Sequence, residues 1–203
     1  SIRRTWVYSR SDALAAMATI GLTWLLGVEA GVIAGVAVSI GLHLWRTSQP
    51  HCAIVGQVPG TEHFRNVDRH NVVTVPDLVT LRVDESLWFP NARFLEDKLL
   101  DLVAGDCALR DIVLMCPAVN SIDASALESL EEINRRLKDA GVTLHLSEVK
   151  GPVMDRLKKT HFLDELTGRV FLTQFDAIQA LRPEVAAAAL RSPRCETAKT
   201  AAA

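Results

Sequence analysis

The sequence predicts an α/β domain preceded by an α-helical transmembrane hairpin, and two observations carry this prediction. The first is a strand-length apolar run over 112–116, followed by a polar loop, an amphipathic helical pattern and a second apolar run over 142–146. This order predicts a βαβ unit with parallel strands. The second observation is the segment from Ala13 to Trp45, which is apolar throughout except for Glu29, with His43 near its end.

The helix of the βαβ unit is predicted by apolar residues that recur at spacings of four, three and four. These residues are Ala126, Leu130, Ile133 and Leu137. Gly141 follows the helix, where a left-handed cap is expected. The polar loop before the helix lies at the carboxyl end of the first strand, the edge where ligands or partners dock in open α/β sheets. The predicted regulatory or partner-binding residues of this loop are Asn120, Ser121, Asp123 and Ser125.

Asp123 and Ser125 also have a purely structural interpretation as helix caps. Either side chain can accept a hydrogen bond from an N–H group of the first helical turn, and Ser125 with Glu128 has the spacing of a capping box. The two interpretations are compatible, because a phosphate on Ser125 would lie at the positive end of the helix dipole.

The apolar segment is too long for one straight membrane helix. Its 33 residues would extend about 50 Å, well beyond the roughly 30 Å hydrocarbon core. Glu29 divides it into two arms of 16 residues, each about 24 Å long as a helix. We therefore expect a hairpin with Glu29 at its turn, reaching headgroups or water, and an ion-coupling carboxylate is the alternative.

A ridge of small residues at four-residue steps would allow the two arms to approach closely in a bilayer. Its members are Gly27, Gly31, Gly35 and Ser39. Basic residues on both flanks predict that both ends of the hairpin face the cytoplasm, which indicates a cell (inner) membrane protein with a cytoplasmic α/β domain. These residues are Arg3, Arg4, Arg10 and Arg46. A secretory signal ending at Ala30 is disfavoured, because another apolar run follows it at once.

Composition argues against several classes of function. The 22 Lys and Arg residues against 24 Asp and Glu give no electrostatic reason to expect a nucleic-acid partner. Four cysteines without CxxC spacing and six histidines without an HExxH pair predict no metal or other cofactor. The glycines form no phosphate-cradling motif, and no Ser or Cys has a His partner implied by the sequence, so an enzyme is not expected.

The remaining elements follow from apolar runs and turn residues. They are predicted as strands at 53–58, 78–83, 86–89 and 170–172, and helices at 91–105, 151–158 and 175–181. Asn91 is the predicted N-cap of its helix, with a ligand contact as the alternative. The predicted organisation is a cytoplasmic loop over 1–11, a hairpin over 12–46, a connector with the first strand over 47–77, the α/β domain over 52–182 and a flexible tail over 183–203.

Three stretches together resemble the core of a STAS domain, the sulphate transporter and anti-sigma-factor antagonist family. They are Val113-Leu114-Met115, Ser121-Ile122-Asp123-Ala124-Ser125 and Gly141-Val142-Thr143-Leu144. Two more resemble the passage from the last membrane helices into the STAS domain of SulP-family anion transporters. These are Gly56-Gln57-Val58-Pro59-Gly60-Thr61 and the run from Leu81 to Ala92.

The resemblance implies a small mixed sheet with helices mainly on one side, in the C-terminal portion of a SulP transporter. It implies a regulatory domain of a secondary anion transporter for sulphate, bicarbonate or dicarboxylates. The family's anion site lies among earlier membrane helices, so the chain is not expected to transport alone. Implied partners are the remaining transmembrane helices, a second copy in a homodimer, and a regulatory protein or nucleotide at the STAS loop.

The alternative is a membrane-tethered STAS switch module controlled by phosphorylation of Ser125. Ser125 matches the position of the phosphorylated serine in the antagonist branch, while Ala126 stands where those antagonists usually have glycine. Residue 1 is Ser rather than Met, and we expect that the chain begins partway through a longer one.

Overall fold

The computed structural model describes residues 10–192, which fall into two compact units divided between Gln49 and Pro50. Most of the predicted cytoplasmic loop, with Arg3 and Arg4, and the end of the predicted tail lie outside the described residues. Each unit is described by itself below.

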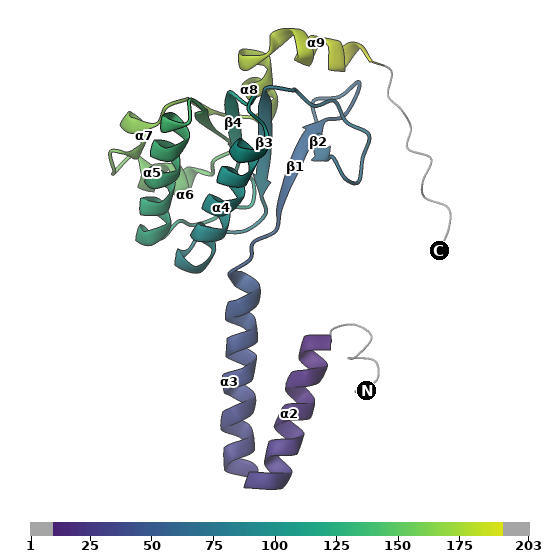
Figure 1. Ribbon diagram of the computed structural model, residues 1–203, viewed down its shortest axis with the longest axis vertical. Coiled ribbons are helices and arrows are strands. Elements are labelled where there is room, and N and C mark those ends of the chain that lie inside the picture. Colours follow the sequence, from purple (N-terminus) through teal and green to yellow (C-terminus); the bar gives the residue numbers. More distant parts are fainter. Residues whose placement is uncertain (1–9, 193–203) are drawn as a thin grey trace. The chain divides into compact units, whose positions relative to one another are not determined.

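The first unit is a helical hairpin of α2 (Arg10–Leu26) and α3 (Val28–Thr47), drawn in Figure 1. Helix α3 is long and apolar enough to cross a membrane by length and composition, and Ala16–Leu25 is a shorter apolar stretch of α2. Gly27 separates the helices with a φ of 90°, a conformation that glycine adopts at little cost. The chain therefore breaks at Gly27, two residues before Glu29, which lies exposed in the first turn of α3.

The two helices approach closely at glycines of the predicted ridge. A Cβ atom added to Gly31 would lie 2.7 Å from Thr23 Cα, and one added to Gly35 would lie 2.7 Å from Thr19 Oγ1. Real Cβ atoms do not approach other atoms this closely. At Gly31 the close atom belongs to the backbone, so a larger residue there requires the helices to separate. The glycines thus allow the backbone contact that holds the hairpin together.

We expect Gly31→Ala to separate α2 from α3. Spin labels on the exposed residues Met17 and Val36, on the two helices, report this separation by electron–electron double resonance. Gly41→Ala is the matched control, since an added Cβ there meets nothing within 4 Å. An unchanged label distance in Gly31→Ala would show that the glycine contact does not set the helix spacing.

The second unit contains a six-stranded mixed sheet in the order β2-β1-β3-β4-β5-β6. Its strands are β1 (Cys52–Gln57), β2 (Phe64–Asn66), β3 (Leu78–Val83), β4 (Asp111–Met115), β5 (Thr143–Ser147) and β6 (Val170–Phe171). β1 runs antiparallel to both β2 and β3, whereas β3, β4, β5 and β6 are mutually parallel. The parallel pairing of β4 with β5 confirms the predicted βαβ unit.

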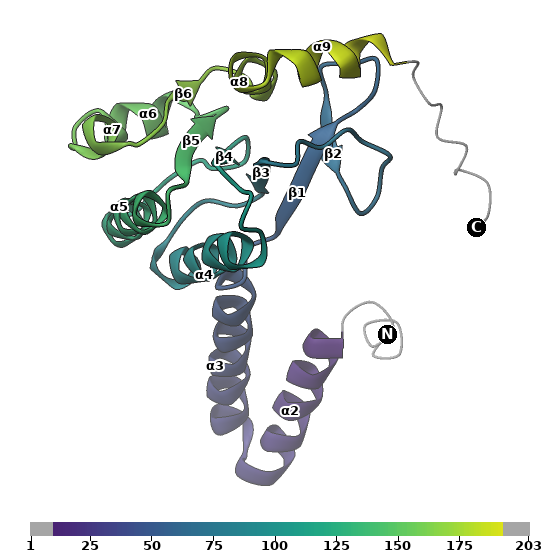
Figure 2. The ribbon, with the colours of Figure 1, turned by 45° about the horizontal axis from the view of Figure 1, so that its top comes forward.

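Helices cover both faces of the sheet unequally, as Figure 2 shows. The helices of this unit are α4 (Phe89–Gly105), α5 (Ala124–Asp139), α6 (Gly151–Leu157), α7 (Phe162–Glu165), α8 (Gln174–Leu181) and α9 (Pro183–Arg191). The larger core cluster packs α4, α5, α6 and α7 on one face, and the smaller cluster packs α8 and α9 on the other. The predicted mixed sheet with helices mainly on one side is confirmed.

The predicted apolar stripe of α5 is confirmed, because all four of its residues are buried. Gly141 follows the helix with a φ of 76°, the left-handed conformation expected of it. The stripe packs on the sheet in the larger core cluster, together with Leu114 of β4 and Leu144 of β5. The position of α5 in turn fixes the loop that precedes it.

Two predicted elements differ in the structure. The strand expected at 86–89 is wrong, because Leu87 makes only an isolated bridge to Ile122 and Phe89 begins α4. Part of the predicted flexible tail is the helix α9, in which Ala186 and Ala189 are buried. Pro183 occupies the first helical position, where its missing N–H is no loss, so a helix starts where the flexible tail was predicted to begin.

Candidate functional site

The predicted loop lies where the carboxyl ends of the parallel strands β3, β4 and β5 meet. The loop follows β4 and pairs with the segment that connects β3 to α4. The N–H of Leu87 donates to the carbonyl of Ser121, with 3.1 Å between nitrogen and oxygen, and Leu87 bridges Ile122. The loop is therefore held against the start of α4.

Asp123 contacts the first turns of two helices. Its Oδ1 accepts a hydrogen bond from the Ala126 N–H at 2.7 Å, which makes it the N-cap of α5. Its Oδ2 accepts another from the N–H of Phe89, the first residue of α4, at 3.0 Å. One carboxylate thus satisfies unpaired N–H groups at two helix ends, both of which favour a negative charge.

Ser125 is not the cap, so the capping box predicted for it with Glu128 is wrong. It lies in the first turn of α5, and its carbonyl accepts a hydrogen bond from Ser129 Oγ at 3.1 Å. Ser125 is half-buried at an open depression of about 590 Å³ between α4 and α5, with Phe89 and Arg93 in the same lining.

One ion pair crosses this depression from α5 to α4, and a second lies within α5. Arg136 Nη1 lies 3.2 Å from Glu96 Oε1 of α4, and Arg136 Nε lies 2.7 Å from Glu132 Oε1. The hydrogen bond from Arg136 holds the pKa of the Glu132 carboxyl below its usual value. The depression is therefore lined by charged groups of both signs.

The first half of the loop is contacted by cationic side chains from the β5–α6 region. Lys150 Nζ donates to Asn120 Oδ1 at 2.6 Å, and Arg156 Nη1 donates to the carbonyl of Ile122 at 3.3 Å. The Asn120 N–H donates to Ser86 Oγ at 3.1 Å. Three of the four predicted site residues, Asn120, Ser121 and Asp123, thus lie along one loop that touches α4, α5 and α6, and Ser125 follows in the first turn of α5.

Asn91 has a structural role different from the predicted one. It is buried, and the N-cap of α4 is Trp88. Asn91 Oδ1 accepts from the Trp88 N–H at 2.8 Å, while its Nδ2 donates to the Ser86 carbonyl at 2.9 Å. The side chain therefore caps α4 by reaching back from the third helical position, and its amide is already bonded on both sides.

Two exposed aromatic residues at this edge of the sheet were not predicted from the sequence. Trp88 is 48% exposed and Phe89 is 62% exposed, immediately before and at the start of α4. Apolar side chains this exposed are typical of contact surfaces when they are grouped. The signal in the sequence was the run from Leu87 to Phe89, which was predicted to be part of a short strand at 86–89.

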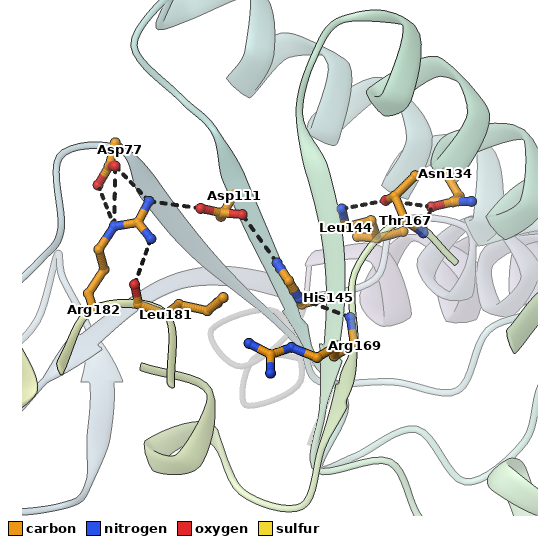
Figure 3. Close-up of polar contacts among 9 residues, drawn as sticks. All are labelled: Asp77, Asp111, Asn134, Leu144, His145, Thr167, Arg169, Leu181 and Arg182. Atoms are coloured by element: carbon orange, nitrogen blue, oxygen red, sulfur yellow. Dashed lines mark hydrogen bonds and ion pairs between the residues drawn. The ribbon is translucent and has the colours of Figure 1, made fainter. Parts of the chain in front are cut away.

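A second polar cluster, also missed, lies at the amino ends of β3 and β4 and is shown in Figure 3. Arg182, just after α8, donates through Nη2 to Asp77 Oδ2 at 2.6 Å and to Asp111 Oδ2 at 2.8 Å. His145 Nε2 lies 3.2 Å from Asp111 Oδ1, and His145 Nδ1 accepts from the Arg169 N–H at 3.0 Å. This acceptor role places the imidazole proton on Nε2, from which it is donated to Asp111.

Figure 3 also shows a polar link between α5 and β5. Asn134 Oδ1 accepts from the Thr167 N–H at 3.1 Å and from Thr167 Oγ1 at 3.0 Å. Thr167 Oγ1 in turn accepts from the N–H of Leu144 at 2.9 Å. Both polar clusters hold helices and loops to the sheet, and neither includes a residue of the predicted loop.

We expect the stability of the domain to decrease as the pH falls through the range where histidine titrates. Burial has the largest influence on the pKa of His145 in the folded protein and lowers it. The hydrogen bond to Asp111 acts in the opposite direction. The unfolded chain then takes up its proton first, below a pH of about 6.5. For this single group the free energy of unfolding changes by at most about 1.4 kcal/mol per pH unit.

The measurement is the urea midpoint of unfolding between neutral and mildly acidic pH. His145→Gln should flatten the decline below pH ~6.5, while His161→Gln, at an exposed histidine, should leave it unchanged. An equal decline in the His145 variant would assign the pH dependence to other groups.

Residues 69–177, more than half of the chain, match the family model described as "STAS domain". Sulfate transporter 3.1 of Arabidopsis thaliana is 28% identical over 187 residues, which cover 86% of this chain and 28% of that protein. A probable sulfate transporter of Mycobacterium tuberculosis (strain ATCC 25618 / H37Rv) is 32% identical over 183 residues, 89% of this chain and 33% of that protein. The chain thus spans at most about a third of the length of these relatives.

Among solved structures, murine solute carrier 26 family member A9, an anion transporter in the inward-facing state, matches with a TM-score of 0.77. The match covers 88% of this chain and 30% of that one at 18% identity, which shows a shared fold. The resemblance drawn from the sequence is therefore confirmed: the chain belongs to the STAS-domain family, and its homologues are sulfate transporters of the SulP class.

Proposed function

We propose that this chain supplies the C-terminal membrane hairpin and the cytoplasmic STAS regulatory domain of a secondary anion transporter. The substrate class would be sulphate, bicarbonate or dicarboxylates, and the partners would be the remaining transmembrane helices. The relatives named as sulfate transporters support this proposal, since this chain aligns with 28% to 33% of their length. A chain that spans so little of them is not expected to transport alone.

Asp123 is the observation that carries the regulatory part of this proposal. Its two carboxylate oxygens bond the first turns of α4 and α5, so a change in the loop that moves Asp123 disturbs both helices. Ser125 lies two residues further on, at the open depression between the same helices. A regulatory protein or nucleotide that binds the loop over 120–125 can therefore alter the α4–α5 surface.

Uptake of labelled sulphate, bicarbonate and succinate into vesicles tests the proposal. The chain is compared with the longest open reading frame that contains it, and only the longer product should transport. In that product, Asp123→Ala should change the uptake rate without changing the amount inserted in the membrane. Asp139→Ala, at an exposed aspartate on the far end of α5, is the control. Uptake by the short chain alone would overturn the proposal.

A second candidate is a membrane-tethered STAS switch controlled by phosphorylation of Ser125. Ser125 favours it, because this residue lies at an open depression in the first turn of α5, where a phosphate meets the positive end of the helix dipole. Mass spectrometry of the protein isolated from its own cells tests for phosphate on Ser125. Absence of uptake by both products, with phosphate on Ser125, would favour this function over the first.

A further inference from the structure

The outermost parallel strand of the sheet, β6, is attached by few backbone bonds. It pairs two residues, Val170 and Phe171, with β5. One further bond joins the N–H of Leu146 to the carbonyl of Arg169, with 3.0 Å between nitrogen and oxygen. We call the segment over 168–172, which contains β6, the edge strap. With so few backbone bonds, its attachment depends on the side chains that it contacts.

Both ends of the edge strap are anchored to the rest of the domain. Thr167, just before it, bonds the Asn134 side chain of α5, as Figure 3 shows. Gln174, at the start of α8, accepts a hydrogen bond from Ser147 Oγ at 2.6 Å and donates one to Thr80 Oγ1 at 2.8 Å. An opening of the edge strap is therefore confined to the residues between these anchors.

His145 of β5 holds the middle of the edge strap through an atom that must carry no proton. Its Nδ1 accepts a hydrogen bond from the Arg169 N–H at 3.0 Å, while its Nε2 donates to Asp111 (Figure 3). A protonated imidazole carries hydrogen on both nitrogens and cannot accept a hydrogen bond. Protonation in place would therefore turn the bond to Arg169 into a contact between two donors.

The packing around His145 prevents the imidazole from avoiding this contact. The ring is buried, and a Cβ atom added to Gly168 would overlap its Nδ1. Turning the ring over would break its bonds to both Arg169 and Asp111. Displacement of the edge strap removes the donor contact and keeps the bond to Asp111.

The charges around His145 also favour displacement of the edge strap. Burial has the largest effect on the pKa of His145 and lowers it, Asp111 raises it, and Arg169 and Arg182 lower it. Arg169 belongs to the edge strap, where its guanidinium lies 5.2 Å from the centroid of the Phe171 ring. Arg182 bonds Asp111 and remains in place. Opening thus hydrates the imidazolium and moves one of the two cations away from it.

We propose that protonation of His145 releases the edge strap, so that β6 detaches from β5 while the rest of the domain stays folded. The edge strap is closed at neutral pH and opens as the medium becomes mildly acidic. This local opening is distinct from the unfolding of the whole domain considered above. It is also separate from the loop over 120–125 and does not depend on the function proposed for that loop.

Hydrogen exchange of the full chain in lipid nanodiscs, followed amide by amide by NMR, tests the proposal. The amides of Arg169 and Leu146 report on the edge strap. The Cys116 amide, which bonds the Ser147 carbonyl, reports on the pairing of β4 with β5. After correction for the intrinsic pH dependence of exchange, the protection of the two strap amides should fall by up to about tenfold per pH unit below pH ~6.5. Low urea concentrations should leave their exchange unchanged, since a local opening exposes little surface.

Two variants separate protonation of His145 from other causes of opening. In His145→Gln the amide oxygen can accept from the Arg169 N–H but does not titrate, so the protection of the strap amides should no longer depend on pH. His161→Gln, at an exposed histidine, should keep the wild-type pH dependence.

Two results with the wild-type protein would overturn the proposal without any variant. One is exchange of the Arg169 and Leu146 amides that depends on urea as steeply as that of Cys116, which would mean that the edge strap opens only when the domain unfolds. The other is a protonated Nδ1 on His145 at neutral pH, seen in the nitrogen-15 shifts of its imidazole. A pH dependence that persists in His145→Gln would also overturn it.

Discussion

Replacing Arg182 with alanine is expected to lower the free energy of unfolding of the second unit by about 3 kcal/mol, the lower end for a broken buried ion pair. The guanidinium bonds both Asp77 and Asp111, and the Asp111 side chain is only 15% exposed. Without Arg182, the largely buried Asp111 carboxylate loses its cation. Of the side-chain partners described above, it then retains only His145. Pulse proteolysis in urea measures the loss.

Two further variants make this prediction specific. Arg182→Lys should recover less than half of the lost stability, because one ammonium group cannot reproduce the fork that reaches both carboxylates. Arg191→Ala removes an exposed arginine from α9 and should change little. If Arg191→Ala cost as much as Arg182→Ala, the effect would come from the loss of any cation in this region.

Asp123→Ala is expected to cost about 2 kcal/mol, since two helix caps of about 1 kcal/mol each are lost together. The informative measurement is hydrogen exchange of two amides, those of Phe89 and Ala126, which bond the two oxygens of this carboxylate. Both should exchange faster in the variant. Asp123→Asn should restore one of them, because an amide side chain offers one acceptor oxygen where the carboxylate offers two.

Asp139→Ala provides the matched control for this experiment. Asp139 is exposed in the last turn of α5, where a negative charge is unfavourable, so its removal should not lower stability. If only the Ala126 amide exchanged faster in Asp123→Ala, Asp123 would be an ordinary cap of α5. The coupling of α4 to α5 proposed above would then have no basis.

The local part of this structure could be predicted from sequence because it depends on periodic patterns. The burial of Ala126 and Leu130 follows from their spacing, and the parallel pairing of β4 with β5 follows from the helix between them. The family was recognisable from short motifs in order. The regulatory role of the predicted site residues stays a prediction, although the structure places them together on one loop and the first turn of the helix that follows it.

The contacts that were missed join residues far apart in the chain. Asp123 bonds Phe89 across 34 positions, and Arg182 bonds Asp77 across 105. No spacing rule connects such pairs, so only the fold reveals them. The start of α4 was missed for a different reason. Its run of large apolar residues is typical of a strand, whereas in the structure the helix already begins at Phe89 and Asn91 bonds back to Trp88.

The edges of the sheet have a consequence for how readily the domain associates with other chains. Its outer strands are β2, with three residues, and β6, with two. Strands this short offer another chain few backbone hydrogen bonds, which guards against aggregation by sheet extension. A second copy that pairs with this domain must therefore use its helices and loops, where side chains can distinguish the right partner from a wrong one.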